Sequence, residues 1–239
     1  CSSDLETTGD ESQAREEEAD EQNGGPAEIP WEAHIDYPAA DVAIALNDQT
    51  AVYGEDAEDM MKNQGGSFGQ ISEKKAGDGY YEFLAYQGEP ACMPMYAPLD
   101  SFYGMEQGGN QAILVKFQSN AVDPCFSLKA GKEYGIRFGA DGVPAFWQED
   151  TNSMEKLPSN VTLNEGEWYY LLMAIDKNGT FRSILWPEQE SEQKSYANRD
   201  LGDENQNGSW NFLLTFAENG SIKIGYYVIF TYESLTPFD

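Results

Sequence analysis

The sequence predicts an all-β protein, in which an antiparallel two-sheet sandwich follows a disordered acidic tether at the N-terminus. Three observations predict this class. From residue 80 onward, short runs of aromatic and β-branched residues alternate with glycine-rich turns, a pattern typical of antiparallel sheets. Aromatic residues make up 13% of the chain, which is high for a soluble protein. The first 30 residues, in contrast, are strongly acidic and show no apolar periodicity.

Residues 1–30 are expected to form the tether, and residues 31–239 the folded domain. The tether contains ten acidic residues and one basic residue, Arg15, and a charge run of this kind is usually a solvated spacer. The segment 31–50 is an ambiguous lead-in, because Ala39 to Leu46 fits either a short helix or an extra strand.

The chain begins with Cys1 instead of a methionine, which is the usual sign of a removed secretion signal. A start of Cys-Ser-Ser before a polar, acidic run resembles processed bacterial lipoproteins, whose N-terminal cysteine carries a diglyceride on sulfur. This resemblance implies that a lipid on Cys1 anchors the protein to a membrane, on the extracytoplasmic side at the cell surface. The alternative interpretation is a chain cut at an arbitrary cysteine.

Two turns in the domain predict β-hairpins. Asn178-Gly179 and Asn219-Gly220 lie between strong strand segments, and Asn-Gly pairs favour the positive φ angles of tight hairpin turns. The segment Trp168–Ile175 is apolar on both faces, as expected for a strand in the middle of a sandwich or under an aromatic-lined groove. The strand pattern matches Tyr80–Tyr86, Ala112–Gln118, Cys125–Lys129, Glu133–Phe138, Ala145–Gln148, Val161–Leu163, Trp168–Ile175, Phe181–Trp186, Trp210–Phe216 and Ser221–Tyr232.

Charge and cysteine content limit the partners of the chain. Its 14 basic and 42 acidic residues give a net charge of −28, which repels phosphates and argues against nucleic-acid binding. Cys92 and Cys125 form an even pair once Cys1 is assigned to lipid, so that a disulfide outside the cytoplasm and two buried free thiols are both compatible with the sequence. A single histidine, His34, gives no histidine-based metal site.

Motifs in the second half of the chain carry a further resemblance. Residues 166–176 read Gly-Glu-Trp-Tyr-Tyr-Leu-Leu-Met-Ala-Ile-Asp, and Asn-Gly-Thr-Phe at 178–181, Ile-Leu-Trp at 184–186 and Trp-Asn-Phe at 210–212 follow. Over roughly residues 51–232 the chain resembles the concanavalin A-like lectin/glucanase superfamily. The resemblance implies a jelly-roll sandwich but no single function, because this superfamily includes lectins, carbohydrate-binding modules, hydrolases and adhesion domains.

The resemblance also directs the search for catalytic and metal sites. Retaining glucanases of this superfamily carry Glu-x-Asp-x-Glu on one strand, so that alternation aims all three carboxylates into one cleft. That motif is absent here, so we expect no enzymatic activity; a glycoside hydrolase or lyase with unusual carboxylates is the alternative. Calcium is common in jelly rolls, and Glu55, Asp56 and Asp59 are the candidate ligands, although a bare acidic turn is the favoured interpretation. No other cofactor is expected.

A sugar binder needs planar apolar surfaces for the C–H faces of pyranose rings, with amides and carboxylates for their hydroxyl groups. Among the tryptophans, Trp168 and Trp210 open apolar strands and favour the core, whereas Trp147 and Trp186 lie at strand ends before polar loops. Arg137 is either a ligand donor or simply an exposed side chain. The candidate ligand-binding residues are Trp147, Gln148, Glu149, Trp186, Trp210, Asn211 and Arg137.

The sequence as a whole favours a lipid-anchored, non-catalytic module that displays a glycan-binding or adhesive surface outside the cell. A structural docking subunit of an envelope complex is a third possibility. Exposed tryptophans without a nearby pair of carboxyl groups would favour the binding module over a hydrolase.

Overall fold

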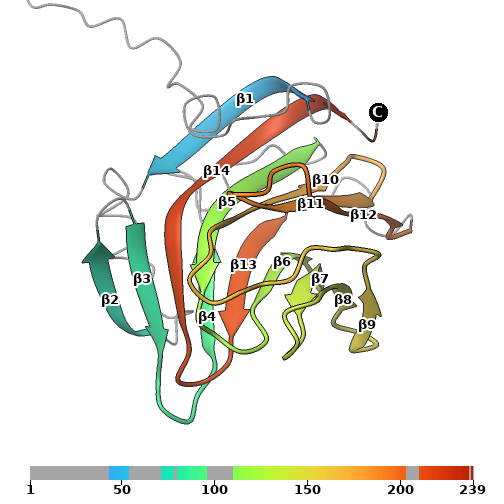
Figure 1. Ribbon diagram of the computed structural model, residues 1–239. Coiled ribbons are helices and arrows are strands. Elements are labelled where there is room, and N and C mark those ends of the chain that lie inside the picture. Colours follow the sequence, from blue (N-terminus) through green and yellow to red (C-terminus); the bar gives the residue numbers. More distant parts are fainter. Residues whose placement is uncertain are drawn as a thin grey trace, which may run out of the picture.

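Two antiparallel sheets pack face to face in this protein (Figure 1). The computed structural model describes residues 43–53, 71–77, 80–95, 110–202, 210–236 and 238. All regular elements in these residues are strands, which confirms the predicted all-β, two-sheet sandwich. The described residues include no helix that is long and apolar enough to cross a bilayer.

The larger sheet contains eight strands and is built around the long strand β14. Its order is β12-β11-β10-β5-β14-β3-β2, and β1 pairs with the second half of β14. The strands are β1 (Ala43–Tyr53), β2 (Ile71–Gly77), β3 (Tyr80–Ala85), β5 (Gln111–Ser119), β10 (Tyr169–Ile175), β11 (Thr180–Pro187), β12 (Ser195–Asp200) and β14 (Ser221–Thr236).

The smaller sheet contains six strands in the order β4-β13-β6-β7-β8-β9. Its strands are β4 (Ala91–Met95), β6 (Cys125–Ala130), β7 (Lys132–Phe138), β8 (Pro144–Gln148), β9 (Ser153–Lys156) and β13 (Asn211–Phe216). Because β3 and β4 belong to different sheets, as do β5 and β6, the chain crosses repeatedly from one layer to the other.

The core lies between the sheets and is rich in aromatic rings. The ring of Phe117 on β5 lies 4.6 Å from that of Phe126 on β6, 5.9 Å from Tyr169 on β10 and 6.1 Å from Phe138 on β7, measured between centroids. All seven residues of β10 are buried, as predicted for a strand that is apolar on both faces. The aromatic cluster around Phe117 therefore joins the two sheets.

The hairpin prediction at Asn178 is confirmed, whereas that at Asn219 is wrong in its pairing. Gly179 has a φ of 80°, and β10 and β11 on either side of the turn pair antiparallel. Asn219 also adopts a positive φ, of 59°, but β13 and β14 belong to different sheets. The Asn-Gly pair at 219–220 thus makes the tight turn expected of it and carries the chain from one layer to the other.

Two other segments differ from the predicted strands or were left open by the prediction. Residues 161–163 form no strand; Val161 is buried, and its amide donates a hydrogen bond to Oγ of Ser159 (2.8 Å). Residues 43–53 are a strand, which resolves the helix-or-strand ambiguity for the part of the lead-in that the structure describes. Cys1, the tether and the acidic residues Glu55, Asp56 and Asp59 lie outside the described residues.

The disulfide that the sequence left open does not form between Cys92 and Cys125. Both are free thiols, located on β4 and β6, and each is paired with Thr215 on the intervening strand β13. Two strand spacings place their Cα atoms roughly 10 Å apart, beyond the ~7 Å limit for a disulfide. Burial raises the pKa of both thiols, and neighbouring Glu133 raises it further, so they are protonated and weakly reactive.

A close backbone approach occurs at Gly135 in the middle of β7. A Cβ atom at this position would lie 2.2 Å from the carbonyl oxygen of Phe126 and 2.8 Å from Cα of Ser127. Both atoms belong to the backbone of the neighbouring strand β6, which cannot yield as the end of a flexible side chain would. The pairing of β6 with β7 therefore requires glycine here.

Replacing Gly135 by alanine is expected to lower the free energy of unfolding by at least about 2 kcal/mol, because the backbone of β6 or β7 must shift. Gly131→Ala is the matched control, since a Cβ there meets no atom within 4 Å and only the positive φ of 91° opposes it. That strain costs about 1 kcal/mol. Urea unfolding measures both variants, and equal losses would contradict the close approach at Gly135.

The free thiols give a second expected result. Alkylation of the denatured full chain without reductant, followed by mass spectrometry, is expected to label both Cys92 and Cys125, because β13 separates them. Reductant is expected to leave Tm unchanged for the same reason. A cross-linked peptide containing both cysteines would show that the strand order β4-β13-β6 is wrong.

Candidate ligand-binding site

Four of the seven predicted ligand-binding residues lie on the outer face of the six-stranded sheet, three of them near one another and Asn211 three strands from Trp147. The inward side chains of this sheet, among them Phe146, Ile136 and Phe212, belong to the core. Alternation therefore turns their strand neighbours Trp147 and Arg137, and Asn211, to the opposite side. We call this surface the Trp147 face and define it by Lys129, Glu133, Arg137, Trp147, Glu149, Met154 and Asn211.

Trp147 is held in a defined orientation on this face and is partly exposed. Its indole Nε1 donates a hydrogen bond to Oδ1 of Asn152 (3.2 Å), and the guanidinium of Arg137 lies 6.0 Å from the ring centroid. Its cross-strand neighbours are Gly135, which has no side chain, and Met154, which is 45% exposed. An apolar platform with open edges results.

A charged cluster borders this platform. Lys129 Nζ lies 3.3 Å from Oε2 of Glu133 and 3.6 Å from Oε1 of Glu149. Oγ of Ser127 donates a hydrogen bond to the other carboxylate oxygen of Glu133 (2.6 Å), and Glu133 is buried. Although burial acts in the other direction, the two carboxylates raise the pKa of Lys129. The cluster thus presents a permanently charged ammonium and carboxylate oxygens side by side.

The other three candidates do not lie on the Trp147 face as exposed side chains. Trp186 is only 2% exposed and stacks on Tyr170, with ring centroids 5.5 Å apart and an interplanar angle of 21°. Trp210 is 5% exposed and packs against Tyr134 in the core. Gln148 follows Trp147 along β8, so alternation points it to the opposite side of the sheet. Because Trp186 and Trp210 are buried, neither ring is exposed to a ligand, and the ligand-binding role predicted for them is wrong.

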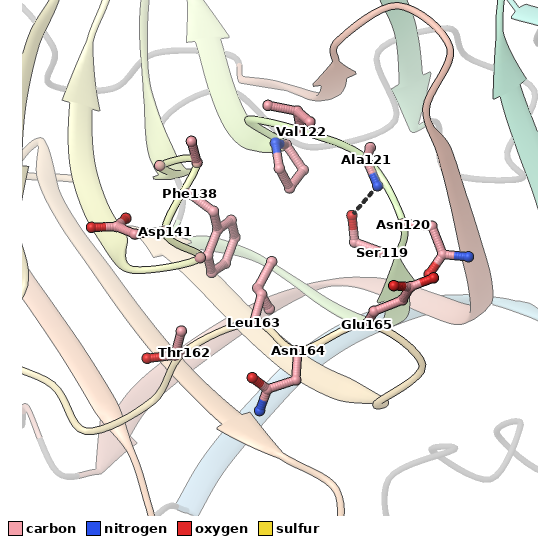
Figure 2. A pocket seen from close by; sticks show the side chains of 14 residues that line it. Ser119, Asn120, Ala121, Val122, Phe138, Asp141, Thr162, Leu163, Asn164 and Glu165 are labelled. Carbon is pink, nitrogen blue, oxygen red and sulfur yellow. Dashed lines mark hydrogen bonds between the residues drawn. The ribbon is translucent and has the colours of Figure 1, made fainter.

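One end of the sandwich contains a pocket of about 400 Å³, shown in Figure 2. It lies where three loops meet, at residues 119–124, 138–142 and 162–165. We call it the end pocket. Phe138 and Leu163 contribute apolar lining, and polar groups come from Asn120, Asp141, Thr162, Asn164 and Glu165. Sequence reasoning missed this pocket, because its residues come from turns far apart in the chain.

Hydrogen bonds hold two of the loops of the end pocket in place. The hydroxyl of Tyr169 accepts a bond from the amide of Asn164 (2.8 Å) and lies 2.9 Å from the carbonyl oxygen of Thr162. Asp141 accepts bonds from Lys156 Nζ (2.7 Å) and from the amide of Val143 (3.2 Å). These bonds, the one from Lys156 first, lower the pKa of the Asp141 carboxyl.

Ion pairs connect two loops of the end pocket to strands of the six-stranded sheet. Asp123, in one pocket loop, lies 4.0 Å from the guanidinium of Arg137, and Asp141 pairs with Lys156 of β9. In contrast, the side chains of Asn120 and Glu165 have no hydrogen-bond partner among the described residues. Their polar atoms are therefore available to a ligand in the pocket.

In the part of the chain that the structure describes, no three histidine, cysteine, aspartate or glutamate side chains are grouped so that they could hold a metal ion. The calcium ligands suggested by the sequence, Glu55, Asp56 and Asp59, lie outside these residues. Calcium binding by this acidic segment stays a prediction.

Comparisons with known proteins give similar folds and no close relatives. No protein-family model matches the chain, and neither does any curated protein. Similar solved structures include a protein of unknown function from Shewanella oneidensis MR-1, with a TM-score of 0.48 and 8% identity, over 80% of this chain and 85% of that one.

Two further similar structures are lectin-type proteins. A peanut lectin has a TM-score of 0.47 and 8% identity over 70% of this chain and 90% of its own. The exoplasmic/lumenal domain of VIP36, bound to Ca²⁺ and Man3GlcNAc, has a TM-score of 0.44 and 9% identity over 70% and 84%. At these values the similarities assign neither a ligand nor an activity to this chain, and the function has to be argued from its own residues.

Proposed function

We propose that this chain is a non-catalytic module that binds a glycan through the Trp147 face. The observation that carries the proposal is that Trp147, Arg137 and Glu149 lie near one another on one outer sheet face, which Asn211 shares three strands away on β13. These residues supply a partly exposed aromatic ring, a guanidinium, a carboxylate and an amide. A pyranose ring needs this combination, because its C–H face is apolar and its rim carries hydroxyl groups.

The Trp147 face offers complementary groups to such a ring. The indole of Trp147 and the exposed side chain of Met154 would contact the C–H face, since both lie on adjacent strands in the same row. Carboxylate oxygens of Glu149 accept hydrogen bonds from the hydroxyl groups of this ring. The amide of Asn211, roughly 14 Å away across three strand spacings, would bind a further residue of an oligosaccharide. Hydrogen bonds with solvent-exposed partners are modest, so we expect weak, multivalent binding typical of an adhesive surface.

The charged cluster argues against glycoside hydrolysis on the same face. A hydrolase needs one carboxyl group that stays protonated as the general acid. Glu133 and Glu149 instead both lie within 4.0 Å of the ammonium of Lys129, and Glu133 is buried. The two carboxylates are therefore better suited to hold Lys129 and to accept hydrogen bonds from hydroxyl groups.

The proposal includes a location outside the cell, on a lipid attached to Cys1. Support comes from the resemblance of the Cys-Ser-Ser run and the acidic segment after it to processed bacterial lipoproteins. The free thiols of Cys92 and Cys125 are compatible with a reducing and with an oxidising compartment, so they give no evidence about the location of the protein. We infer that the acidic segment spaces the binding face away from an anionic membrane, which the net charge of −28 repels.

Trp147→Ala is expected to weaken glycan binding by at least about tenfold, or ~1.4 kcal/mol, because the stacking surface is lost. A glycan array with the full chain identifies the ligand, and titration calorimetry measures the variants. Asn211→Ala is expected to weaken the same interaction to a smaller degree. Tyr86→Ala is the matched control, since Tyr86 is 47% exposed in the turn between β3 and β4. Unchanged binding by Trp147→Ala and Asn211→Ala would refute the Trp147 face as the site.

The lipid anchor is tested separately. Protein isolated from the membranes of its source organism is expected to carry a diacylglyceryl group on Cys1, which mass spectrometry of the N-terminal peptide detects. The chain is expected to stay with the membrane fraction at high salt, because a lipid anchor, unlike electrostatic adhesion, is insensitive to ionic strength. An unmodified cysteine would contradict anchoring and leave the binding proposal intact.

A further inference from the structure

The outer face of the eight-stranded sheet carries a second group of aromatic side chains, on the opposite side of the molecule from the Trp147 face. Tyr80 on β3 pairs with Gly77 on β2, and Lys116 on β5 pairs with Tyr170 on β10. Between them, Gly225 interrupts the register of β14 against β5. Gly225 therefore lies inside the sheet beside Lys116, whereas Gly77 lies next to Tyr80 on the edge strand β2.

Two partly exposed aromatic rings occupy the space above these glycines. A Cβ on Gly77 would lie 2.1 Å from Cζ of Tyr80, so the phenol ring covers this position. A Cβ on Gly225 would lie 3.5 Å from Cζ3 of Trp168 and 3.1 Å from Cδ of Lys116. The rings of Tyr80 and Trp168 are 5.9 Å apart between centroids and inclined by 56°. The glycines thus allow two rings to sit low on the sheet and face solvent in part.

Charged groups surround these rings. Lys116 Nζ lies 5.3 Å from the Trp168 ring centroid and 2.6 Å from Oε1 of Glu188, which also accepts a hydrogen bond from the hydroxyl of Tyr170 (3.1 Å). Lys116 is thereby neutralised. The second oxygen of Glu188 has no partner among the described residues, and it is free to accept from a ligand hydroxyl.

Lys223 differs from Lys116, because it forms no ion pair with a carboxylate of the described residues. Its ammonium lies 5.0 Å from the ring centroid of Tyr80, and in the part of the chain that the structure describes no carboxylate oxygen lies within 4.0 Å. Its cross-strand neighbour Glu82 instead accepts a hydrogen bond from Ser221 (2.7 Å). In a chain with a net charge of −28, a partly buried lysine without an acidic partner is conspicuous beside two aromatic rings.

We propose that Tyr80, Lys116, Trp168, Glu188 and Lys223, which we call the Trp168 platform, form a second glycan site that takes sugars with a carboxylate, such as uronic acids. The pyranose ring stacks on the exposed side of the Trp168 indole, and the carboxylate of the sugar pairs with Lys223. Hydroxyl groups donate to Glu188. Charges farther than about 8 Å are screened at physiological ionic strength, so the nearby groups act on a bound sugar more strongly than the net charge of the chain. Among them, Glu188 is paired with Lys116, and Glu82, the cross-strand neighbour of Lys223, is hydrogen-bonded to Ser221.

The site stands independently of the Trp147 face, since the two surfaces belong to different sheets. The probes are oligomers of galacturonate, alginate oligomers and glucuronate-containing oligomers, each with its carboxyl-reduced neutral counterpart. Titration calorimetry with the full chain is expected to detect the acidic oligomers of at least one series and to find its neutral counterpart at least about tenfold weaker, as for loss of a charged hydrogen bond.

Two variants and two controls locate the binding. Trp168→Ala is expected to weaken binding of the acidic oligomer by at least about tenfold, and Lys223→Gln to remove the preference for the acidic over the neutral oligomer. Lys177→Gln is the matched control, because it removes the same charge from an exposed position in the turn after β10. Trp147→Ala is expected to leave this binding unchanged. Melting curves verify that each variant is folded.

Each outcome decides the proposal. Failure of all three acidic series to bind overturns it, and so does equal binding of acidic and neutral oligomers. The proposal is also overturned if Trp147→Ala abolishes binding of the acidic oligomer and Trp168→Ala leaves it unchanged. That result would support the function proposed for the Trp147 face. If Trp168→Ala fails to fold, Lys223→Gln alone decides, because a surface lysine substitution leaves the core intact.

Discussion

The aromatic cluster around Phe117 is the interaction on which the rest of the structure depends. It joins β5 and β10 of one sheet to β6 and β7 of the other, with all four rings buried. Since strand residues alternate between faces, burying Phe117 turns Lys116 outward, and burying Tyr169 turns Trp168 and Tyr170 outward. Burying Phe138 does the same for Arg137. One packing requirement thus sets the orientation of both candidate binding surfaces, one on each sheet.

How far the fold could be predicted depended on how much of each strand is buried. Strands with several buried aromatic or aliphatic residues, such as β5, β7 and β10, were recognisable from sequence because burial requires a run of apolar residues. The strands that were missed lie at sheet edges, among them β9, whose four residues are all exposed, and β2, which carries lysines and a glutamate. An edge strand pairs on one side only, and polar residues there limit further pairing, so its pattern resembles that of a loop.

The site was predictable where strand alternation decided exposure, and unpredictable where residues from other strands decided it. Trp147 faces outward because Phe146 must face inward. Trp186 also faces away from the inter-sheet core, yet it is buried against Tyr170 of the neighbouring strand, a contact that no local pattern encodes. Trp168 opens an apolar segment and was expected in the core, but the bulge at Gly225 gives its ring a place on the surface. The end pocket, made by three distant loops, had no sequence signal at all.

The excess of acidic over basic residues decides which unpaired surface charges indicate a binding site. In a chain with three acidic residues for each basic one, a carboxylate without a cationic partner, such as that of Glu165, is the ordinary case. A cation without an acidic partner is not ordinary, because acids are abundant on every surface. Lys116, Lys129, Lys132, Arg137, Lys156, Arg182 and Arg199 all lie within 4.0 Å of a carboxylate. Lys177, in an exposed turn, and Lys223, on a sheet face, both lie outside this distance from any carboxylate of the described residues. Of the two, Lys223 is the one that is partly buried and lies beside an aromatic ring, that of Tyr80, which makes it the candidate for an anionic ligand.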